Sequence, residues 1–296
     1  MINVNFSKKE FSKLKKLELE NSILNTEAQL FLLENNKNHK LDGKLLKYFY
    51  NTTGTYFSNK LYITNELIYK KGIIDIPEIV MPDYLMSIDN EICGYVMPYI
   101  KSDNLGVILM DNKVPLTKKV EYLKRVGELL EKIKNVRKYT TVNDIYLNDL
   151  HEGNFIVGKE DKKLYLVDSD SIKIGTSIPV VAKYLTPFSK INEVAKYQKY
   201  FDGEEYLIEP DQNTEIYSYI VMIFNLFYGD NISNLSIAEY YSYLEYLADI
   251  GVPIEFLDIM GYIYTGHENV NPGEYLEEIE PFYGRTNKNV YERVKN

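Results

Sequence analysis

Tryptophan is absent from this chain of 296 residues, cysteine occurs once and histidine three times. The single cysteine, Cys93, excludes an intramolecular disulfide and a cysteine-rich zinc site, and three scattered histidines do not supply a metal site instead. No apolar run reaches the roughly 18 residues that a membrane-spanning helix needs, and the N-terminus lacks the apolar core of a signal peptide. We therefore expect a cytoplasmic protein, or one delivered to a host cell, with no membrane partner.

Positive charge is also scarce. The chain has 34 Lys and Arg residues against 43 Asp and Glu residues, a formal net charge of −9 and a pI near 5.1. A nucleic-acid-binding domain is usually basic, with a stripe of Lys and Arg on one face. The lysines between residues 8 and 16 are interleaved with acidic residues, which favours a solvated helix face. The charge balance predicts no nucleic-acid partner.

Hydrophobic residues make up 45% of the chain and charged residues 26%, enough to bury a sizeable core. Residues 27–100 carry short apolar runs broken by turn signals, whereas helical spacing dominates after residue 115. This order predicts an α+β protein of two lobes. The expected division is an N-terminal extension over 1–26, a small β-rich lobe over 27–100 and a larger helical lobe over 101–296.

Apolar periodicity predicts several individual elements. Strands are expected over 28–34, 44–49, 92–100, 154–157 and 164–167. Turns are expected over 35–43 and 158–163, and helices over 59–71, 120–133 and 216–227.

One stretch carries groups suited to phosphoryl transfer. Asp149 is followed five residues later by Asn154, and Asp168 lies fourteen residues beyond, after a predicted hairpin. Transfer from ATP needs a carboxylate that accepts the proton of the attacking hydroxyl, and oxygen ligands that hold Mg²⁺ on the phosphates. The hairpin would return Asn154 and Asp168 to one metal site. In isolation, D-x-x-x-x-N is equally typical of a turn with a helix-capping Asp.

The pattern resembles the catalytic loop and metal-binding segment of the protein-kinase-like superfamily. The run D-L-H-E-G-N is similar to aminoglycoside phosphotransferases and atypical kinases, and L-V-D-S-D-S resembles a group of bacterial kinase-like proteins. The resemblance implies that the cofactors are ATP and Mg²⁺, that Asp149 is the catalytic base, and that Asn154 and Asp168 are the metal ligands.

By the same resemblance, G-K-L-L-K-Y-F is the strand with the ATP-contacting lysine, at Lys47, and Glu66 on the following helix is its partner. Lys44 is a rival, but an odd offset places it on the opposite strand face, so at most one of the two points into the site. Lys47 is preferred because Leu45 and Leu46 precede it.

Residues 94–100, G-Y-V-M-P-Y-I, resemble the hinge strand between kinase lobes. Met97 would be the gatekeeper, Pro98 would offer its carbonyl to adenine and Ile100 its N–H. A buried strand that ends at a proline is the compatible simpler interpretation.

Downstream, residues 184–187 resemble the end of an activation segment, and residues 213–229 the large buried helix of a kinase C-lobe. Glu215 stands where kinases usually have an Asp that braces the catalytic loop, and Thr214 is a candidate cap for this helix.

The chain departs from the pattern at several points. Without G-x-G-x-x-G, the turn over 35–43 would have to cover the phosphates. Asp170 replaces the usual glycine after D-F; it either contacts the metal site or caps a turn. His151 either contacts phosphate or metal, or packs beneath the catalytic loop.

Three functions remain open. The leading hypothesis is an ATP-dependent phosphotransferase with a hydroxyl acceptor, a Ser/Thr protein kinase; the second is a small-molecule kinase of the aminoglycoside or choline type. The third is a pseudokinase that acts as a binding module, which the missing glycine loop and the altered D-S-D motivate.

Overall fold

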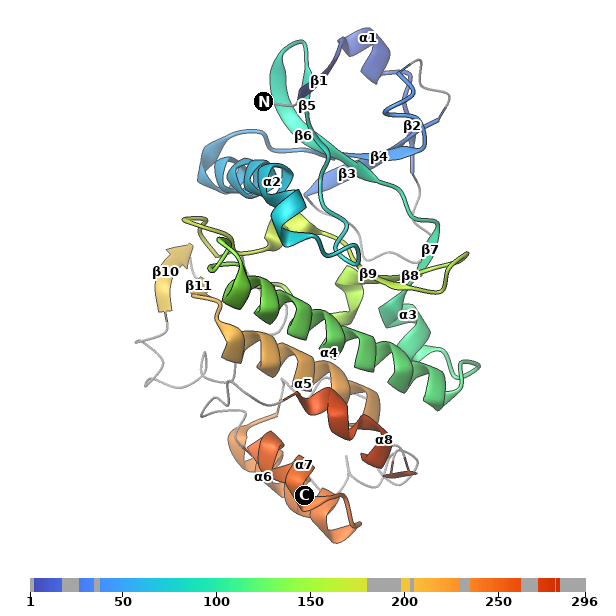
Figure 1. Ribbon diagram of the computed structural model, residues 1–296, viewed down its shortest axis with the longest axis vertical. Helices are drawn as coiled ribbons and strands as arrows, with labels where there is room; N and C mark the ends of the chain where they lie inside the picture. The colour runs from blue at the N-terminus through green and yellow to red at the C-terminus, as the bar shows by residue number, and fades with distance from the viewer. Residues whose placement is uncertain are drawn as a thin grey trace.

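A computed structural model describes residues 3–17, 27–34, 38–179, 198–202, 205–228, 235–261, 271–279 and 281–282. It is a mixed α+β protein. The largest sheet lies at one end, most helices lie at the other, and a small three-stranded sheet lies between them (Figure 1). Among the described residues, no helix combines the length and apolar character needed to cross a membrane.

The large sheet has six strands in the order β1-β5-β6-β4-β3-β2. Its elements are β1 (Asn3–Phe6), α1 (Lys8–Phe11), β2 (Lys15–Lys16), β3 (Ala28–Leu33), β4 (Lys44–Phe49), α2 (Gly54–Ile74), β5 (Tyr84–Ile88) and β6 (Glu91–Pro98). All neighbouring strands are antiparallel except β1 and β5, which are parallel. The residues expected to form a separate N-terminal extension thus contribute two strands to this sheet.

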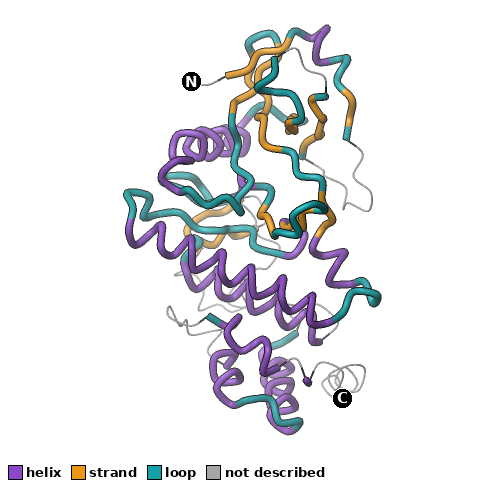
Figure 2. The backbone as a smooth tube through the Cα atoms, turned by 45° about the vertical axis from the view of Figure 1, so that its right-hand side comes forward, coloured by secondary structure: helices purple, strands orange, loops and turns teal. Residues whose placement is uncertain are grey.

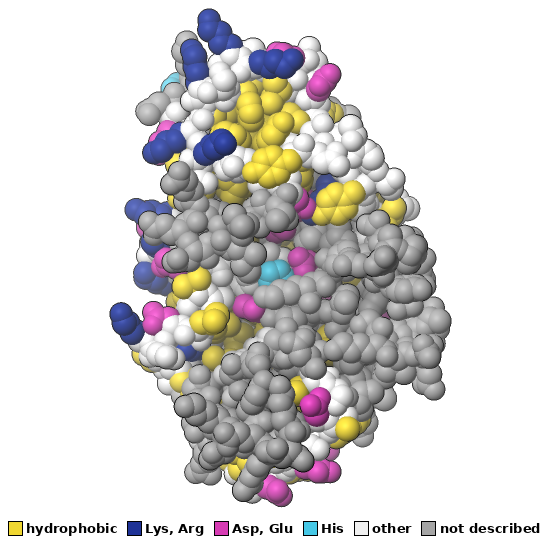
Figure 3. Space-filling model, turned by 180° about the vertical axis from the view of Figure 1, so that it is seen from behind, with side chains coloured by type: hydrophobic (Ala, Val, Ile, Leu, Met, Phe, Trp, Pro, Cys, Tyr) yellow, Lys and Arg dark blue, Asp and Glu magenta, His cyan; other side chains and the backbone are white. Residues whose placement is uncertain are grey.

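Both faces of β4 pack against hydrophobic clusters, and each face also carries one lysine. Leu46 packs with Phe31 and Met86 in a cluster on one face, where the rings of Phe11 and Tyr48 lie 5.1 Å apart. Hydrophobic side chains are conspicuous over this end of the molecule when it is seen from behind (Figure 3). Alternate residues of a strand point to opposite faces, so the odd-numbered residues of β4 face the rest of the chain.

Helix α2 packs between this sheet and the helices. Its start follows a turn in which the backbone N–H and side-chain hydroxyl of Thr53 donate to Asn51, and its end is marked by Asp75 in a left-handed conformation. Ile63 and Leu67 are completely buried, as spacing by one helical turn allows. The helix is longer at both ends than the predicted range over 59–71.

The second part of the chain is mainly helical (Figure 2). Its elements are β7 (Ser102–Asn104), α3 (Leu105–Met110), α4 (Leu116–Tyr139), η1 (Glu152–Asn154), β8 (Phe155–Gly158), β9 (Leu164–Leu166), η2 (Ser169–Ser171), β10 (Gln198–Asp202), β11 (Glu205–Ile208), α5 (Gln212–Tyr228), α6 (Ile237–Asp249), α7 (Ile254–Gly261), η7 (Pro272–Tyr275) and α8 (Leu276–Ile279).

The largest hydrophobic cluster joins these elements. It includes Leu67 of α2, Leu123 of α4, Phe155 of β8 and Ile220 of α5, each at most 1% exposed. Because the same core holds α2, α4 and the β8–β9 hairpin, the segments that carry polar groups between them have fixed positions.

Candidate active site

Asp149 and Asn154 lie in one tightly bonded loop. The Asn154 side-chain amide donates to the backbone carbonyl of Asp149 at 2.9 Å and to its carboxylate Oδ2 at 3.2 Å. His151 accepts the Gly153 N–H at Nδ1, 3.0 Å away, and its Nε2 lies 3.5 Å from the Asp149 carboxylate. The imidazole therefore caps η1 and faces Asp149. The contacts with Asn154 and His151 hold the Asp149 carboxylate in one orientation.

Helix α5 holds this loop through the side chain of Glu215. Glu215, 1% exposed, accepts the backbone N–H of Leu147 at 2.8 Å and forms an ion pair with Arg137 at 2.9 Å. Arg137 also donates to the carbonyl of Ile145 at 3.0 Å. These contacts fix the chain two residues before Asp149, which is the bracing position predicted for Glu215.

The predicted cap of this helix was misplaced. Helix α5 begins at Gln212, and the Asp211 side chain accepts the backbone N–H of Thr214 at 2.9 Å. Asp211, rather than Thr214, therefore satisfies a free donor of the first helical turn.

The β8–β9 hairpin joins Asn154 to Asp168, as the sequence predicts. Phe155 pairs with Leu166, and the Val167 N–H donates to the Asn154 carbonyl at 2.8 Å. Asp168 follows directly, with φ 60° and ψ 38° in the left-handed region. A residue other than glycine adopts this conformation at a cost and is often held there at functional sites.

Two serines that follow Asp168 anchor the η2 turn. The Ser169 hydroxyl donates to the Val80 carbonyl at 2.9 Å, and the Ser171 hydroxyl donates to the Asp168 carbonyl at 2.8 Å. Val80 in turn donates its N–H to Leu166 of β9 at 2.9 Å. The segment after α2 therefore fixes the backbone that presents Asp168.

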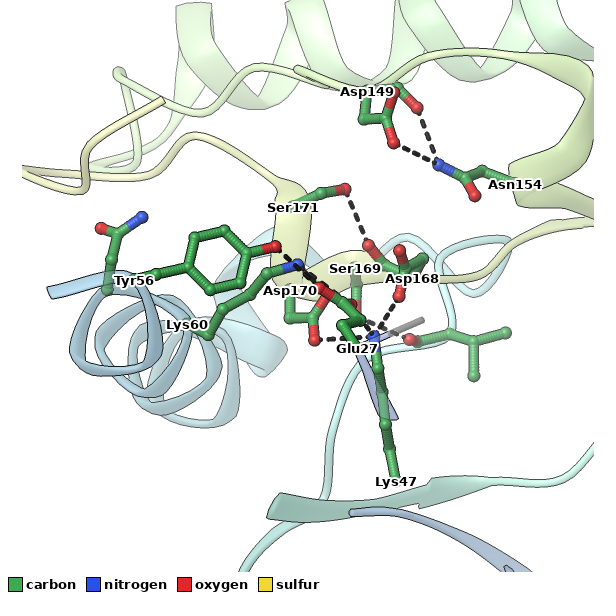
Figure 4. Close-up of polar contacts among 12 residues, drawn as sticks. Glu27, Lys47, Tyr56, Lys60, Asp149, Asn154, Asp168, Ser169, Asp170 and Ser171 are labelled. Carbon is green, nitrogen blue, oxygen red and sulfur yellow. Dashed lines mark hydrogen bonds and ion pairs between the residues drawn. The ribbon is translucent and has the colours of Figure 1, made fainter. Parts of the chain in front are cut away.

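Lys47 projects from β4 into a group of carboxylates (Figure 4). Its ammonium lies 3.0 Å from Glu27 and 2.9 Å from Asp170, and it is also hydrogen-bonded to Asp168. The lysine is 2% exposed. The rival Lys44 forms an ion pair with Asp83, so the predicted choice of Lys47 as the residue that faces this site is supported.

The carboxylate expected from α2 is replaced by a lysine. Glu66 forms an ion pair with Lys70 at 2.8 Å, whereas Lys60 reaches Asp170 at 3.1 Å and Glu27 at 3.5 Å. Residues six apart on an α-helix are rotated by about 120° around its axis, so Lys60 and Glu66 occupy different faces. The prediction that Glu66 pairs with Lys47 is therefore wrong, and Asp170 contributes a carboxylate to Lys47.

The cluster of two ammonium groups and three carboxylates shifts the pKa values of its members. Burial raises the pKa of Asp168, but the ammonium groups of Lys47 and Lys60 outweigh it and leave that pKa below its usual value. Burial opposes the charge of Lys47, yet Asp168 and Asp170 raise the pKa of its ammonium well above the usual value. Both groups are therefore held in their charged forms.

Two groups of oxygens lie near this site as candidate ligands for a divalent cation. The carboxylates of Glu27, Asp168 and Asp170 lie within 4.8 Å of one another. The Lys47 ammonium forms an ion pair with all three and therefore occupies the place of a cation among them. In Asn154 the amide nitrogen is directed to Asp149, and Figure 4 shows its oxygen on the side of Asp168. The oxygens of Asn154 and Asp168 match the hard ligands that Mg²⁺ prefers.

The predicted hinge lies beside this site. Met97 is 5% exposed, pairs with Leu45 and packs in the cluster that contains Phe49 and Tyr95. Strand β6 ends at Pro98, which pairs with Lys44, and Ile100 follows outside the strand. Contacts of Pro98 and Ile100 with adenine stay predictions.

The turn expected to cover the phosphates lies elsewhere. Leu33 pairs with Lys44 at the end of the β3–β4 hairpin that this turn closes, whereas Ala28 pairs with Phe49 at the other end, next to Glu27. The turn and the Glu27 carboxylate are therefore at opposite ends of the hairpin. Residues 184–187, the expected end of an activation segment, lie outside the described residues.

Sequence reasoning missed Glu27 and Lys60. Lys60 falls in the buried stripe of α2 that includes Phe57, Thr64 and Leu67, so a lysine at apolar helical spacing was the available signal. Glu27 precedes β3 without a pattern that separates it from a solvent-exposed turn residue. No family model matches this chain, and neither does any curated protein.

Proposed function

We propose that the protein is an ATP- and Mg²⁺-dependent phosphotransferase that transfers a γ-phosphoryl group to a hydroxyl. One observation supports the proposal above all. A hairpin joins the Asp149–Asn154 loop to Asp168, and a buried lysine from the large sheet reaches the same Asp168. A proton acceptor, oxygen ligands for a metal and a phosphate-binding cation thus come from separate segments of the chain that these contacts connect.

Each residue has a distinct role in the proposed reaction. The Asp149 carboxylate accepts the proton of the acceptor hydroxyl while that oxygen forms a bond to the γ-phosphorus. The bond between the γ-phosphorus and its bridging oxygen breaks, and ADP leaves with the electron pair. Lys47 exchanges carboxylate contacts for phosphate oxygens and holds them in line. Asp149 then releases its proton to water.

Asn154 and Asp168 are the residues that would hold Mg²⁺. The metal would neutralise the triphosphate charge and orient its oxygens. Asn154 has a second role, because its amide N–H group keeps the Asp149 carboxylate directed by hydrogen bonds.

The acceptor we propose is a Ser or Thr hydroxyl of a protein. The contact of Glu215 with the Leu147 N–H supports this class, because protein kinases brace their catalytic loop with an Asp at the corresponding place. The resemblance of D-L-H-E-G-N to aminoglycoside phosphotransferases makes a small hydroxyl compound the competing acceptor.

The test is transfer from γ-labelled ATP in the presence of Mg²⁺, with and without a protein lysate and a panel of aminoglycosides, sugars and amino alcohols. We expect wild-type protein to label a protein band or itself. Asp149→Asn should lose at least about a hundredfold of this activity because the proton acceptor is gone. Asp168→Asn should lose it as well, while Asn tolerates the left-handed backbone at this position.

The matched control is Asp258→Asn, on the exposed surface of α7, which should retain wild-type labelling. Labelling of a small compound alone would keep phosphotransfer but overturn the protein acceptor. Absence of labelling and of ATP consumption by wild-type protein, whose fold is verified by circular dichroism, would overturn the enzyme and favour a binding module.

A further inference from the structure

We infer that Asp170 is a positioning residue that holds the Lys47 ammonium in place, and that Lys60 holds Asp170 from helix α2. The inference rests on the proposed function, because Lys47 is the group that would contact the phosphates of ATP. It assigns to an aspartate of the η2 turn and a helical lysine the task that the resemblance would give to Glu66.

The contacts of Asp170 divide between its two oxygens. Oδ2 accepts from Lys47 at 2.9 Å, and Oδ1 accepts from Lys60 at 3.1 Å. The carboxylate is 0% exposed, and each lysine is 2% exposed. Asp170 is therefore a buried bridge between β4 and α2, and a carboxylate whose two oxygens both bind ammonium groups is not the oxygen donor that a metal needs.

The bridge joins three segments that are each fixed by independent contacts. The Asn59 side chain forms two hydrogen bonds of 2.8 Å with the backbone N–H and carbonyl of Ile178, and Thr176 donates to the Tyr62 hydroxyl. These contacts attach α2 to the segment after η2. They set the face of α2 that carries Lys60 toward Asp170.

The charges of the cluster explain why Lys47 needs the Asp170 carboxylate. Two ammonium groups side by side repel one another in a buried site, and each needs a carboxylate partner. Asp168 and Glu27 also contact Lys47, but Asp168 is a proposed metal ligand and Glu27 is only half-buried. Asp170 is the member of the group that can stay with Lys47 when the triphosphate takes the other contacts.

The geometry allows the carboxylate of Asp170 to be moved to position 60 as a test of its role. Lys47 and Lys60 both lie within 3.5 Å of the same Glu27 oxygen, so a single carboxylate oxygen bridges the two ammonium groups. A glutamate in place of Lys60 would direct its carboxylate toward Lys47. It could then take over the task of Asp170.

The experiment measures kcat and KM for ATP in four variants. Asp170→Asn should lower kcat/KM for ATP by roughly a hundredfold, with most of the loss in KM, because the lysine that binds the phosphates is no longer directed. Lys60→Glu alone should also be impaired, because it faces the Asp170 carboxylate. The double variant Asp170→Asn with Lys60→Glu should recover at least about tenfold over Asp170→Asn. Lys70→Met, on the same helix, is the control.

Thermal unfolding with and without Mg·ATP separates the possible roles. A purely structural Asp170 would lower the unfolding temperature of the variants and leave kcat/KM per folded molecule unchanged, which overturns the inference. A double variant no better than Asp170→Asn overturns it as well. An inactive wild-type protein would overturn the proposed function first, whereas an active wild-type protein with an equally active Asp170→Asn variant would overturn only this inference.

Discussion

The Glu215 carboxylate accepts the backbone N–H of Leu147 at 2.8 Å and at the same time pairs with Arg137 at 2.9 Å. A side chain of α5 thereby joins the loop that carries Asp149 to α4, on which Arg137 lies. The position of the proposed proton acceptor, Asp149, therefore depends on a contact made two residues earlier in the chain.

Removal of the Glu215 carboxylate should lower the stability of the fold. Glu215→Ala leaves the Arg137 guanidinium buried without its partner, and we expect the free energy of unfolding to fall by about 3–5 kcal/mol. Urea denaturation measures the change. Glu255→Ala, at an exposed position of α7, should change it by less than about 0.5 kcal/mol. Equal urea midpoints of unfolding for Glu215→Ala and Glu255→Ala would show that the contacts of Glu215 contribute nothing to stability.

The pair of hydrogen bonds between Asn59 and Ile178 should control local opening. Asn59→Ala removes both bonds, which together contribute about 1–3 kcal/mol, and frees the chain around residues 172–179. Hydrogen exchange of the Ile178 amide should accelerate at least about tenfold. Ser58→Ala, at the exposed neighbour, is the control, and unchanged exchange in Asn59→Ala would disprove the coupling.

The charged cluster predicts a defined dependence of stability on pH. The pKa of Asp168 lies below its ordinary value of 3.8, since the ammonium groups of Lys47 and Lys60 outweigh burial. A lowered carboxyl pKa contributes stability that is complete above the unfolded value and is lost as pH falls through the folded one. The raised pKa of Lys47 contributes stability below its ordinary 10.5, lost as pH rises through the folded value.

The cluster should therefore stabilise the fold evenly between about pH 5 and pH 10 and lose its contribution below about pH 4. Unfolding temperatures measured across this range test the expectation. Lys47→Met should flatten the acid limb, because Asp168 then loses one of the ammonium groups that lower its pKa. A Lys47→Met profile parallel to wild type at acid pH would contradict this account.

Strand β1 is an integral part of the large sheet. Phe6 is 7% exposed and packs with Phe31, Leu46 and Met86. Phe6→Ala should lower the free energy of unfolding by about 3 kcal/mol through lost burial and a residual cavity. Tyr50→Ala, at a side chain that is 55% exposed, should change it little in the same urea titration. A Phe6→Ala loss below about 1 kcal/mol would mean that this strand is dispensable.

The elements predicted best are those whose local patterns agree with their surroundings. The strand over 44–49 has the predicted bounds, and the hairpin after Asn154 returns to Asp168 as expected, because short apolar runs bounded by polar turns define both. The helix expected over 59–71 begins earlier, at Gly54, because its first turn has no apolar repeat to mark it.

The polar cluster could not be derived in the same way. The partner of Lys60 lies 110 residues further along the chain, and no local pattern connects them. The resemblance to kinases points to Glu66 on this helix, whereas the direction of side chains around the helix axis brings Lys60 to the cluster. Strand β1 was not predicted because its polar–apolar alternation spans only four residues, too few to distinguish it from a chance pattern.

The parallel pairing of β1 with β5 has a consequence for biosynthesis. Asn3 bonds to Ser87, 84 residues away in sequence, so β1 has no partner strand until β5 has been translated. Contacts this distant form late and slowly. Strand β1 must therefore stay unpaired while β2 to β5 are translated, and chaperones that bind extended segments have that interval in which to capture it.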